Sequence, residues 1–336
     1  MLTSCTNENH EGFGWVNHKL IQSKKSQAHI NAFGGEDRFW IGPEAGKFGI
    51  FFEPNQDQTF TNWQTPACID SEPFKVANTS NNRIELSHTA KFKNYQNFEF
   101  EIGINRLIQI LSKKQIASAL NLEVNHQLNC VGFTSENTLE NLSSSQWDKS
   151  TGLLNIWILG MFKPSNKGWA LLPTQKGATI NTNYFKSDFN NRLIETENLT
   201  LYKTDGNAKG KIGLSPNHDK NVVGSFDFEK NILTIVTYET NKEDVFLNSE
   251  WNFDAPPYLG DVLNVYNDGK NEDGSILGPY YELETSSSSK ELKKNERIYH
   301  KHSTFHLSGD FYELNQVCWS VFGADLNTLK KLIDGK

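Results

Sequence analysis

The residues best suited to chemistry are two glutamates late in the chain, Glu282 and Glu284, in the segment that starts at Tyr280. The residue types favour a strand, in which side chains two positions apart point to the same face. Carboxylates on one face repel each other unless a proton, a metal or a cation lies between them. The pair is therefore a candidate general base. In the alternative interpretation, one glutamate faces solvent and the other pairs with a lysine or arginine. The preceding polar stretch adds Asp261 and Asn267 as candidate ligand contacts.

A second polar cluster follows two glycines and contains Glu36, Asp37, Arg38 and Trp40. The glycines permit a tight turn or a positive φ. Carboxylates and a guanidinium can form bidentate hydrogen bonds to hydroxyl groups, and an indole can stack on the apolar face of a sugar ring. We predict that Glu36, Arg38 and Trp40 bind a sugar and lie in the same concavity as Glu282 or Glu284, and that Asp37 is a catalytic candidate. The alternative is a structural turn with a Glu36–Arg38 ion pair and Trp40 in the core.

Three of the nine histidines fall within seven residues, at His300, His302 and His306. On a regular strand they share one face, and the first two could ligate a single metal ion. His306 lies too far along the strand to join them. We expect instead that His300 and His302 hydrogen-bond sugar hydroxyls or buried backbone, and we predict neither a metal nor a cofactor.

The elements that must position these residues show mainly strand periodicity. Phe98, Phe100, Ile102 and Ile104, for example, alternate with polar residues or glycine. Comparable strands are expected at residues 14–21, 48–52, 83–88, 127–134, 153–162, 209–214, 222–228, 232–238, 280–285 and 297–307. Helical periodicity occurs only at residues 113–122 and 326–333. Many antiparallel strands without strand–helix alternation predict an all-β sandwich or barrel, with residues 1–336 in one domain.

Composition and missing motifs exclude several classes of function. The formal net charge of −7 disfavours nucleic acid as a partner, because such binding depends on neutralising phosphates. No apolar run approaches the ~20 residues of a membrane-spanning helix. The sequence lacks the GxSxG, GxxxxGK[ST], HExxH and GxGxxG motifs of serine hydrolases, P-loop proteins, zincins and dinucleotide-binding folds. The oligomeric state is not indicated.

Several segments resemble the bacterial family DUF6786, which is related to galactose mutarotase-like proteins: Phe13 to His18, Asn31 to Glu44, Ile156 to Phe162, Tyr266 to Gly269 and Tyr281 to Ser287. The resemblance covers nearly the whole chain and implies a β-supersandwich that binds carbohydrate on its concave sheet. Mutarotases open the sugar ring with a glutamate base and a histidine acid. The Gly-Gly-His motif of these relatives reads Gly34-Gly35-Glu36 here, so we expect ordinary aldose 1-epimerase activity to be weak or absent.

The leading hypothesis is a carbohydrate-binding, mutarotase-like protein of a bacterial glycan-utilisation pathway. One alternative is a carbohydrate-active enzyme, an epimerase, glycoside hydrolase or lyase, that uses a late-strand glutamate as its base. Another is a structural surface protein without a small ligand. The resembled family generally carries an additional N-terminal strand region and often a secretion signal. We therefore expect a periplasmic or extracellular location if an upstream signal is missing from this chain, and a cytoplasmic location otherwise.

Overall fold

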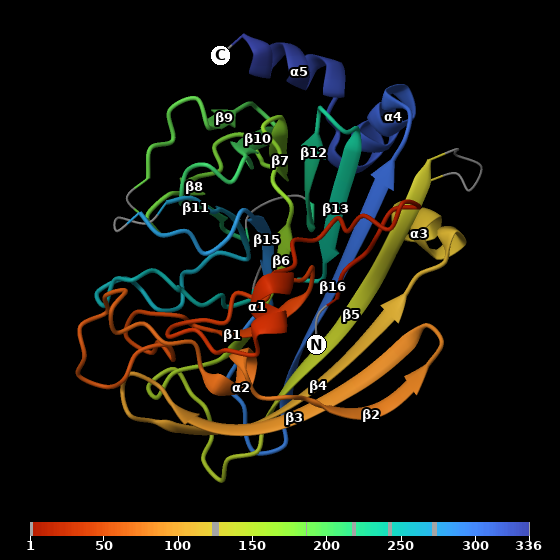
Figure 1. The fold of residues 1–336 in the computed structure, drawn as a ribbon. Coiled ribbons are helices and arrows are strands. Elements are labelled where there is room, and N and C mark those ends of the chain that lie inside the picture. The colour runs from red at the N-terminus through yellow and green to blue at the C-terminus, as the bar shows by residue number, and fades with distance from the viewer. Residues whose placement is uncertain are drawn as a thin grey trace.

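The strands of the protein form two sheets in which neighbouring strands run antiparallel (Figure 1). The computed structural model describes residues 3–122, 128–185, 187–216, 220–240, 244–270 and 274–335. Within these ranges the smaller sheet has six strands, in the order β1 (Arg38–Gly42), β6 (Asn155–Phe162), β15 (Tyr281–Ser286), β14 (Leu263–Asn267), β11 (Gly210–Leu214) and β8 (Ile180–Asn181). The larger sheet has ten, in the order β2 (Lys75–Ser80), β3 (Arg83–Lys93), β4 (Glu99–Ile110), β5 (Asn129–Asn141), β16 (Arg297–Ser308), β13 (Ile232–Tyr238), β12 (Val222–Asp227), β7 (Gly168–Pro173), β10 (Leu199–Lys203) and β9 (Leu193–Glu195).

The helices are short, and the two longest ones follow polar capping residues. They are α1 (His18–Ser23), α2 (Ala67–Asp70), α3 (Lys113–Ala119), α4 (Phe311–Phe322) and α5 (Leu326–Asp334). The Asp310 carboxylate accepts the first free backbone N–H groups of α4, and Asp325 does the same for α5, which satisfies donors that a helix start leaves unpaired. Helix α4 packs its buried residues against the outer side of the larger sheet.

The predicted all-β antiparallel fold with a short C-terminal helical segment is confirmed. Most expected strands are present, and both expected helices are present at residues 113–119 and 326–334. Two expected strands are wrong: residues 14–21 contain only isolated bridges and the start of α1, and residues 48–52 form turns. Helix α4 was not predicted.

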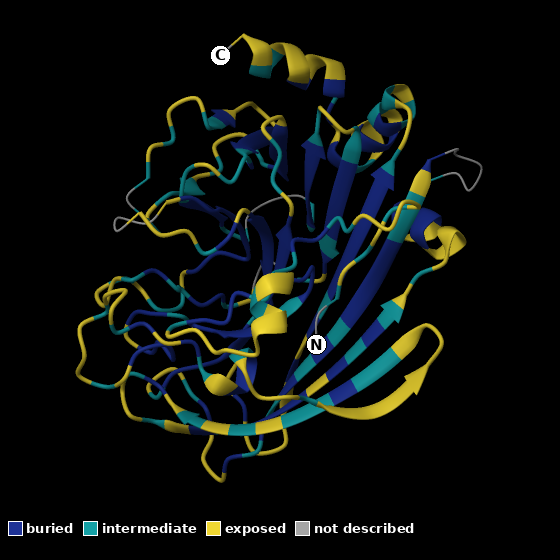
Figure 2. Ribbon diagram, in the orientation of Figure 1, coloured by how far each residue is buried: buried dark blue, intermediate teal, exposed yellow. Residues whose placement is uncertain are grey.

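The two faces of the smaller sheet have different environments, as β15 shows. Its residues Tyr281 and Leu283 pack with Val223 and Val236 of the larger sheet, in a core between the sheets. Glu282 and Glu284 alternate with them and therefore point to the outer face of the smaller sheet. The strands in the middle of the molecule are buried on both faces (Figure 2), because loops cover that outer face.

Candidate functional site

A cavity of about 90 Å³ lies on the outer face of the six-stranded sheet. The sheet forms its floor through side chains of β1, β6, β15, β14 and β11, and loops form its walls. Aromatic rings supply most of the lining, among them Trp40, Phe60, Trp63, Trp157, Trp251 and Tyr280. The charged residues of the lining are Glu44, Lys209, Lys211, Glu282 and Glu284.

Glu284 is held as a buried, ion-paired carboxylate. One of its oxygens, Oε2, accepts a hydrogen bond from Lys211 Nζ at 2.8 Å and another from Trp157 Nε1 at 2.9 Å. The Lys211 ammonium also lies 4.5 Å from the centre of the Trp157 ring, which favours the cation. The other oxygen, Oε1, is buried and has no hydrogen-bond partner in the described part of the chain. Glu284 can therefore accept one more hydrogen bond from a ligand.

Glu282 has a different environment on the same face of β15. No hydrogen bond or ion pair reaches its carboxyl group from the residues that the structure describes. Burial raises the pKa of Glu282 well above its ordinary value, and the charge of Glu284 raises it further, while Lys211 and Arg38 lower it. Burial favours the neutral form of such a group. The two neighbouring carboxyl groups thus differ in their contacts, since Glu284 is ion-paired with Lys211 and Glu282 is not, and different environments of this kind are suited to acid–base chemistry.

The aromatic rings give the cavity flat, apolar walls. Trp40 and Trp157 meet edge to face with ring centres 5.3 Å apart, and Trp63 and Trp251 stack at 6.3 Å. Phe60 stacks on Trp63 and is 40% exposed, so it lies at the mouth. The Nε1 donor of Trp40 is buried and lacks a partner among the described residues. A ligand with apolar faces and hydroxyl groups could stack on these walls and also accept a hydrogen bond from Trp40 Nε1.

The remaining charged groups are fixed by neighbours around the cavity. Glu44 accepts a hydrogen bond from Trp251 Nε1 at 3.0 Å, and burial raises the pKa of Glu44 although Lys211 opposes this. Arg38 pairs with Asp70, and its guanidinium lies 5.2 Å from the centre of the Trp40 ring. Arg38 therefore lies beside the cavity and acts on Glu282 through its charge.

The chain matches the family described as "Family of unknown function (DUF6786)" over residues 1–333. It belongs to this family. Among solved structures, the Slr1438 protein from Synechocystis sp. PCC 6803 is 13% identical, with a TM-score of 0.50 over 92% of this chain and 88% of that one. A putative mutarotase (YeaD) from Salmonella typhimurium is 10% identical, with a TM-score of 0.50 over 91% and 84%. These similarities show a galactose mutarotase-like fold. No curated protein matches the sequence.

Of the residues predicted from the sequence of this DUF6786 member, Trp40, Glu282 and Glu284 line the cavity together, and Arg38 lies next to them. Asp261 lies one layer behind. Its Oδ2 accepts hydrogen bonds from Tyr184 at 2.6 Å and Asn181 at 2.8 Å, and burial raises its pKa. Gly213 makes this position possible, because a Cβ there would lie 2.0 Å from the Asp261 carboxylate.

Glu36 and Asp37 do not line the cavity, so the predicted place of Glu36 in one concavity with the late glutamates is wrong, and the catalytic role of Asp37 stays a prediction. Both point to the opposite face of the smaller sheet. Glu36 pairs with His306 at 2.8 Å and not with Arg38, which also excludes the alternative Glu36–Arg38 ion pair. Asp37 pairs with Arg106 and accepts a hydrogen bond from Ser135 at 2.9 Å. A bend at Glu36, two residues before β1 begins, breaks the strand alternation on which the prediction depended.

His300, His302 and Asn267 also lie away from the cavity, so the ligand contacts predicted for them are not in this cavity and stay predictions. Both imidazoles lie between the sheets and share the hydroxyl group of Thr285, at 2.8 and 2.9 Å. Burial lowers the pKa of His300 to about 3 and that of His302 well below its ordinary value. Asn267 donates to the Ala208 carbonyl at 2.8 Å and accepts from Gly206 N–H at 2.9 Å, so it fixes the turn before β11.

Sequence reasoning missed the cavity residues Glu44, Lys211, Trp63 and Trp251. For Lys211 a signal was present: it is the single charged residue in the otherwise small and apolar segment of β11. A charged residue in a buried strand needs a partner, and Glu284 is that partner. The loop residues carry no periodic pattern, so only the three-dimensional structure brings them to the sheet.

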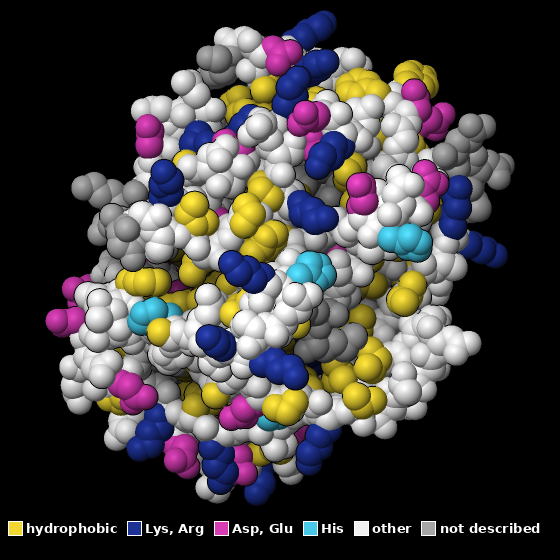
Figure 3. Space-filling view, in the orientation of Figure 1, with side chains coloured by type: hydrophobic (Ala, Val, Ile, Leu, Met, Phe, Trp, Pro, Cys, Tyr) yellow, Lys and Arg dark blue, Asp and Glu magenta, His cyan; other side chains and the backbone are white. Residues whose placement is uncertain are grey.

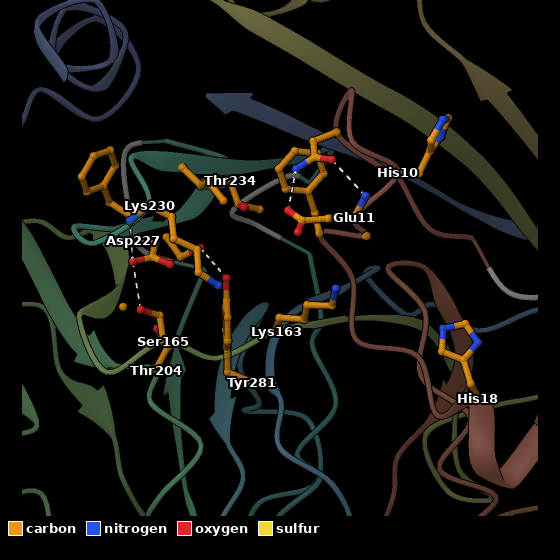
Figure 4. Close-up of a pocket in the computed structure, with 17 residues that line it drawn as sticks. His10, Glu11, His18, Lys163, Ser165, Thr204, Asp227, Lys230, Thr234 and Tyr281 are labelled. Carbon is orange, nitrogen blue, oxygen red and sulfur yellow. Dashed lines mark hydrogen bonds between the residues drawn. The ribbon is translucent and has the colours of Figure 1, made fainter. Parts of the chain in front are cut away.

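A second cavity, of about 440 Å³, opens between the two sheets beside the N-terminal segment (Figure 4). Its floor is rich in hydroxyl groups: Tyr281 and Ser225 share a hydrogen bond of 2.7 Å, and Ser165 donates to Asp227 at 2.9 Å. Tyr281 faces this cavity whereas its neighbour on β15, Glu282, faces the smaller one, so the strand separates the two. No residue predicted from the sequence lines the larger cavity.

Proposed function

We propose that this protein binds a carbohydrate in the aromatic cavity on the outer face of the six-stranded sheet. The observation that carries the proposal is the combination of indole walls with buried polar groups that lack partners among the described residues, Trp40 Nε1 and Glu284 Oε1. A sugar ring supplies apolar C–H faces for the indoles and hydroxyl groups for the unpaired donor and acceptor. Unpaired buried polar groups cost free energy, which a hydroxylated ligand would recover.

The net charge of the protein agrees with a ligand that is not a polyanion. On the face shown in Figure 3, acidic side chains lie mostly toward the rim and basic ones also across the middle, while the formal net charge of −7 disfavours a nucleic acid. No described helix has both the length and the apolar character needed to cross a bilayer. One structural relative of the fold is described as a putative mutarotase, and we propose a role in bacterial glycan utilisation on that basis.

The binding proposal is tested by titrating monosaccharides and oligosaccharides into the protein and following tryptophan fluorescence and heat. We expect Trp63→Ala to weaken binding of any sugar that binds by tenfold or more, which corresponds to about 1.4 kcal/mol. Trp319→Ala is the matched control, because Trp319 is 61% exposed on α4 and away from the cavity. Saturable binding that Trp63→Ala leaves unchanged would refute the assignment of this cavity. If no sugar binds, a structural surface protein becomes the better description.

A second function, catalysis on the bound sugar, is favoured by the different environments of the carboxyl groups of Glu282 and Glu284. Glu284 is ion-paired with Lys211 and suited to accept a proton, whereas Glu282 is unpaired and its pKa is raised. Enzymes use such a pair as general base and general acid. Catalysis predicts that Glu282→Gln and Glu284→Gln each lower the rate on the true substrate by about 10²-fold or more while sugar binding persists. Glu140→Gln, a change on the larger sheet, is the control.

A further inference from the structure

Three side chains of metal-binding type converge on the opposite side of the six-stranded sheet from the aromatic cavity. A ligand atom of each, from Cys5, Glu36 and His306, lies within 4.8 Å of the other two. They come from the N-terminal segment, the loop before β1 and β16, so the fold brings together three distant parts of the chain. Thiolate, imidazole and carboxylate are the three ligand types that zinc accepts in proteins.

The surrounding contacts hold two of the three donors in position. Glu36 Oε1 accepts hydrogen bonds from the backbone N–H groups of Cys5, at 2.7 Å, and Gly14, at 2.8 Å. The other oxygen, Oε2, is therefore directed at His306 Nε2, 2.8 Å away. The Phe13 ring stacks on the His306 imidazole with centres 4.4 Å apart. Both contacts restrict rotation of the side chains, as pre-organised ligands require.

The second ring nitrogen of His306 has the partner that a metal ligand needs. Its Nδ1 lies 3.0 Å from Thr234 Oγ1. Thr234 is on β13 and borders the larger cavity (Figure 4). Histidines bound to metals almost always hydrogen-bond through their other nitrogen, which fixes the tautomer and the ring orientation. With the Nδ1 proton donated to Thr234, the Nε2 lone pair is free for a metal.

We infer that Cys5, Glu36 and His306 form a Zn²⁺ site with three protein ligands, in which Thr234 orients His306. Binding releases the Cys5 thiol proton to water, and His306 binds the metal through an Nε2 that carries no proton, with its Nδ1–H directed at Thr234. Ligand atoms about 2.0–2.3 Å from a tetrahedral zinc lie roughly 3.3–3.7 Å apart, so Glu36 Oε2 and His306 Nε2 must separate by roughly 0.5 Å or slightly more. A cavity of about 210 Å³ lined by Phe13, Cys130 and His306 provides an entry path and room for water as the fourth ligand.

The test uses the full chain without a histidine tag, after intact-mass spectrometry has shown that the Cys5 thiol is unmodified. Zinc content after titration and desalting is measured by elemental analysis, and affinity by competition with a colorimetric chelator. We expect about one zinc per chain, at least tenfold weaker binding in Cys5→Ser, and 10–100-fold weaker binding in Thr234→Val. Cys68→Ser is the matched control, since Cys68 is another free cysteine and lies outside both the three-donor cluster and the entry cavity.

Cobalt substitution provides a measurement that does not depend on how well the variants fold. Bound Co²⁺ in the parent protein should show the near-ultraviolet charge-transfer band of a thiolate ligand. The inference is overturned if the parent binds no stoichiometric zinc, if bound cobalt lacks the thiolate band, or if Cys5→Ser and Cys68→Ser bind zinc equally well.

Discussion

Replacing Lys211 with methionine tests the charge arrangement of the cavity most directly. Lys211 and Glu284 form an ion pair at 2.8 Å, and their side chains are only 6% and 1% exposed. Methionine keeps an unbranched chain that can still pack against Trp157 and Tyr184, whose rings the ammonium contacts. The substitution therefore removes the charge with little change in packing, and it leaves Glu284 buried with Trp157 Nε1 as its only hydrogen-bond donor within the described chain.

The expected cost follows from the burial of both partners. Breaking a buried pair by removing one partner typically costs about 3–5 kcal/mol, because an uncompensated charge remains in a medium of low dielectric constant. We expect the free energy of unfolding of Lys211→Met to fall by about 3 kcal/mol at pH 7.5.

The measurement is urea denaturation of four proteins: the parent, Lys211→Met, Glu284→Gln and the double variant. The double variant should recover a large part of the stability lost in Lys211→Met, since glutamine carries no charge that needs Lys211. The resulting double-mutant cycle isolates the coupling between the two side chains. A loss below about 1 kcal/mol in Lys211→Met, or no recovery in the double variant, would refute the inference that this pair is buried and charged.

Three further outcomes test other parts of the structure. Because the pKa of Glu282 is raised in the folded protein, the contribution of Glu282 to stability should be lost as pH rises above about 4.5. Relative to the parent, Glu282→Gln, which cannot titrate, should be equally stable near pH 4.5 and more stable at pH 8 in urea denaturation, and equal curves at both pH values would contradict this. Because the folded pKa values of His300 and His302 are depressed, the unfolded chain gains protons first and stability should decline from about pH 6.5 downward, by ~1.4 kcal/mol per pH unit for each histidine. Replacing both with glutamine should flatten this decline, whereas His18→Gln, an exposed control, should not. Polarimetry should show weak or no mutarotation of glucose and galactose, since no histidine lines the aromatic cavity within the described residues; a robust rate lost in Glu284→Gln would show this expectation to be wrong.

Strand alternation made much of the fold predictable, and its limits explain the errors. The alternation of Phe100, Ile102 and Ile104 correctly indicated β4, and the same rule placed Glu282 and Glu284 on one face of β15. It failed at Glu36, where a bend and the positive φ of Gly34 and Gly35 precede β1. A rule of period two holds only while the backbone stays extended.

Helix α4 was missed although its sequence contains a helical pattern. Its buried residues Leu314, Val317, Cys318 and Phe322 recur at spacings of three or four, as one face of a helix requires. Aromatic and β-branched residues in the same segment favour strands, and their presence concealed the pattern. The Asp310 cap and Gly323, which ends the helix with φ of 69°, were the additional signals that could have identified it.

The candidate site depends on pairings that no local pattern reveals. Lys211 and Glu284 are 73 residues apart, and they meet because β14 lies between β11 and β15 and fixes the register of both. In that register Lys211 lies opposite Tyr266, and Tyr266 lies opposite Glu282, so one row across three strands carries a lysine, a tyrosine and a glutamate to the same face. A shift of one residue in either pairing would turn one of these side chains into the core between the sheets. The charged floor of the cavity is therefore a consequence of sheet register, and the residues that fix the turn before β11, such as Asn267, support the site without touching it.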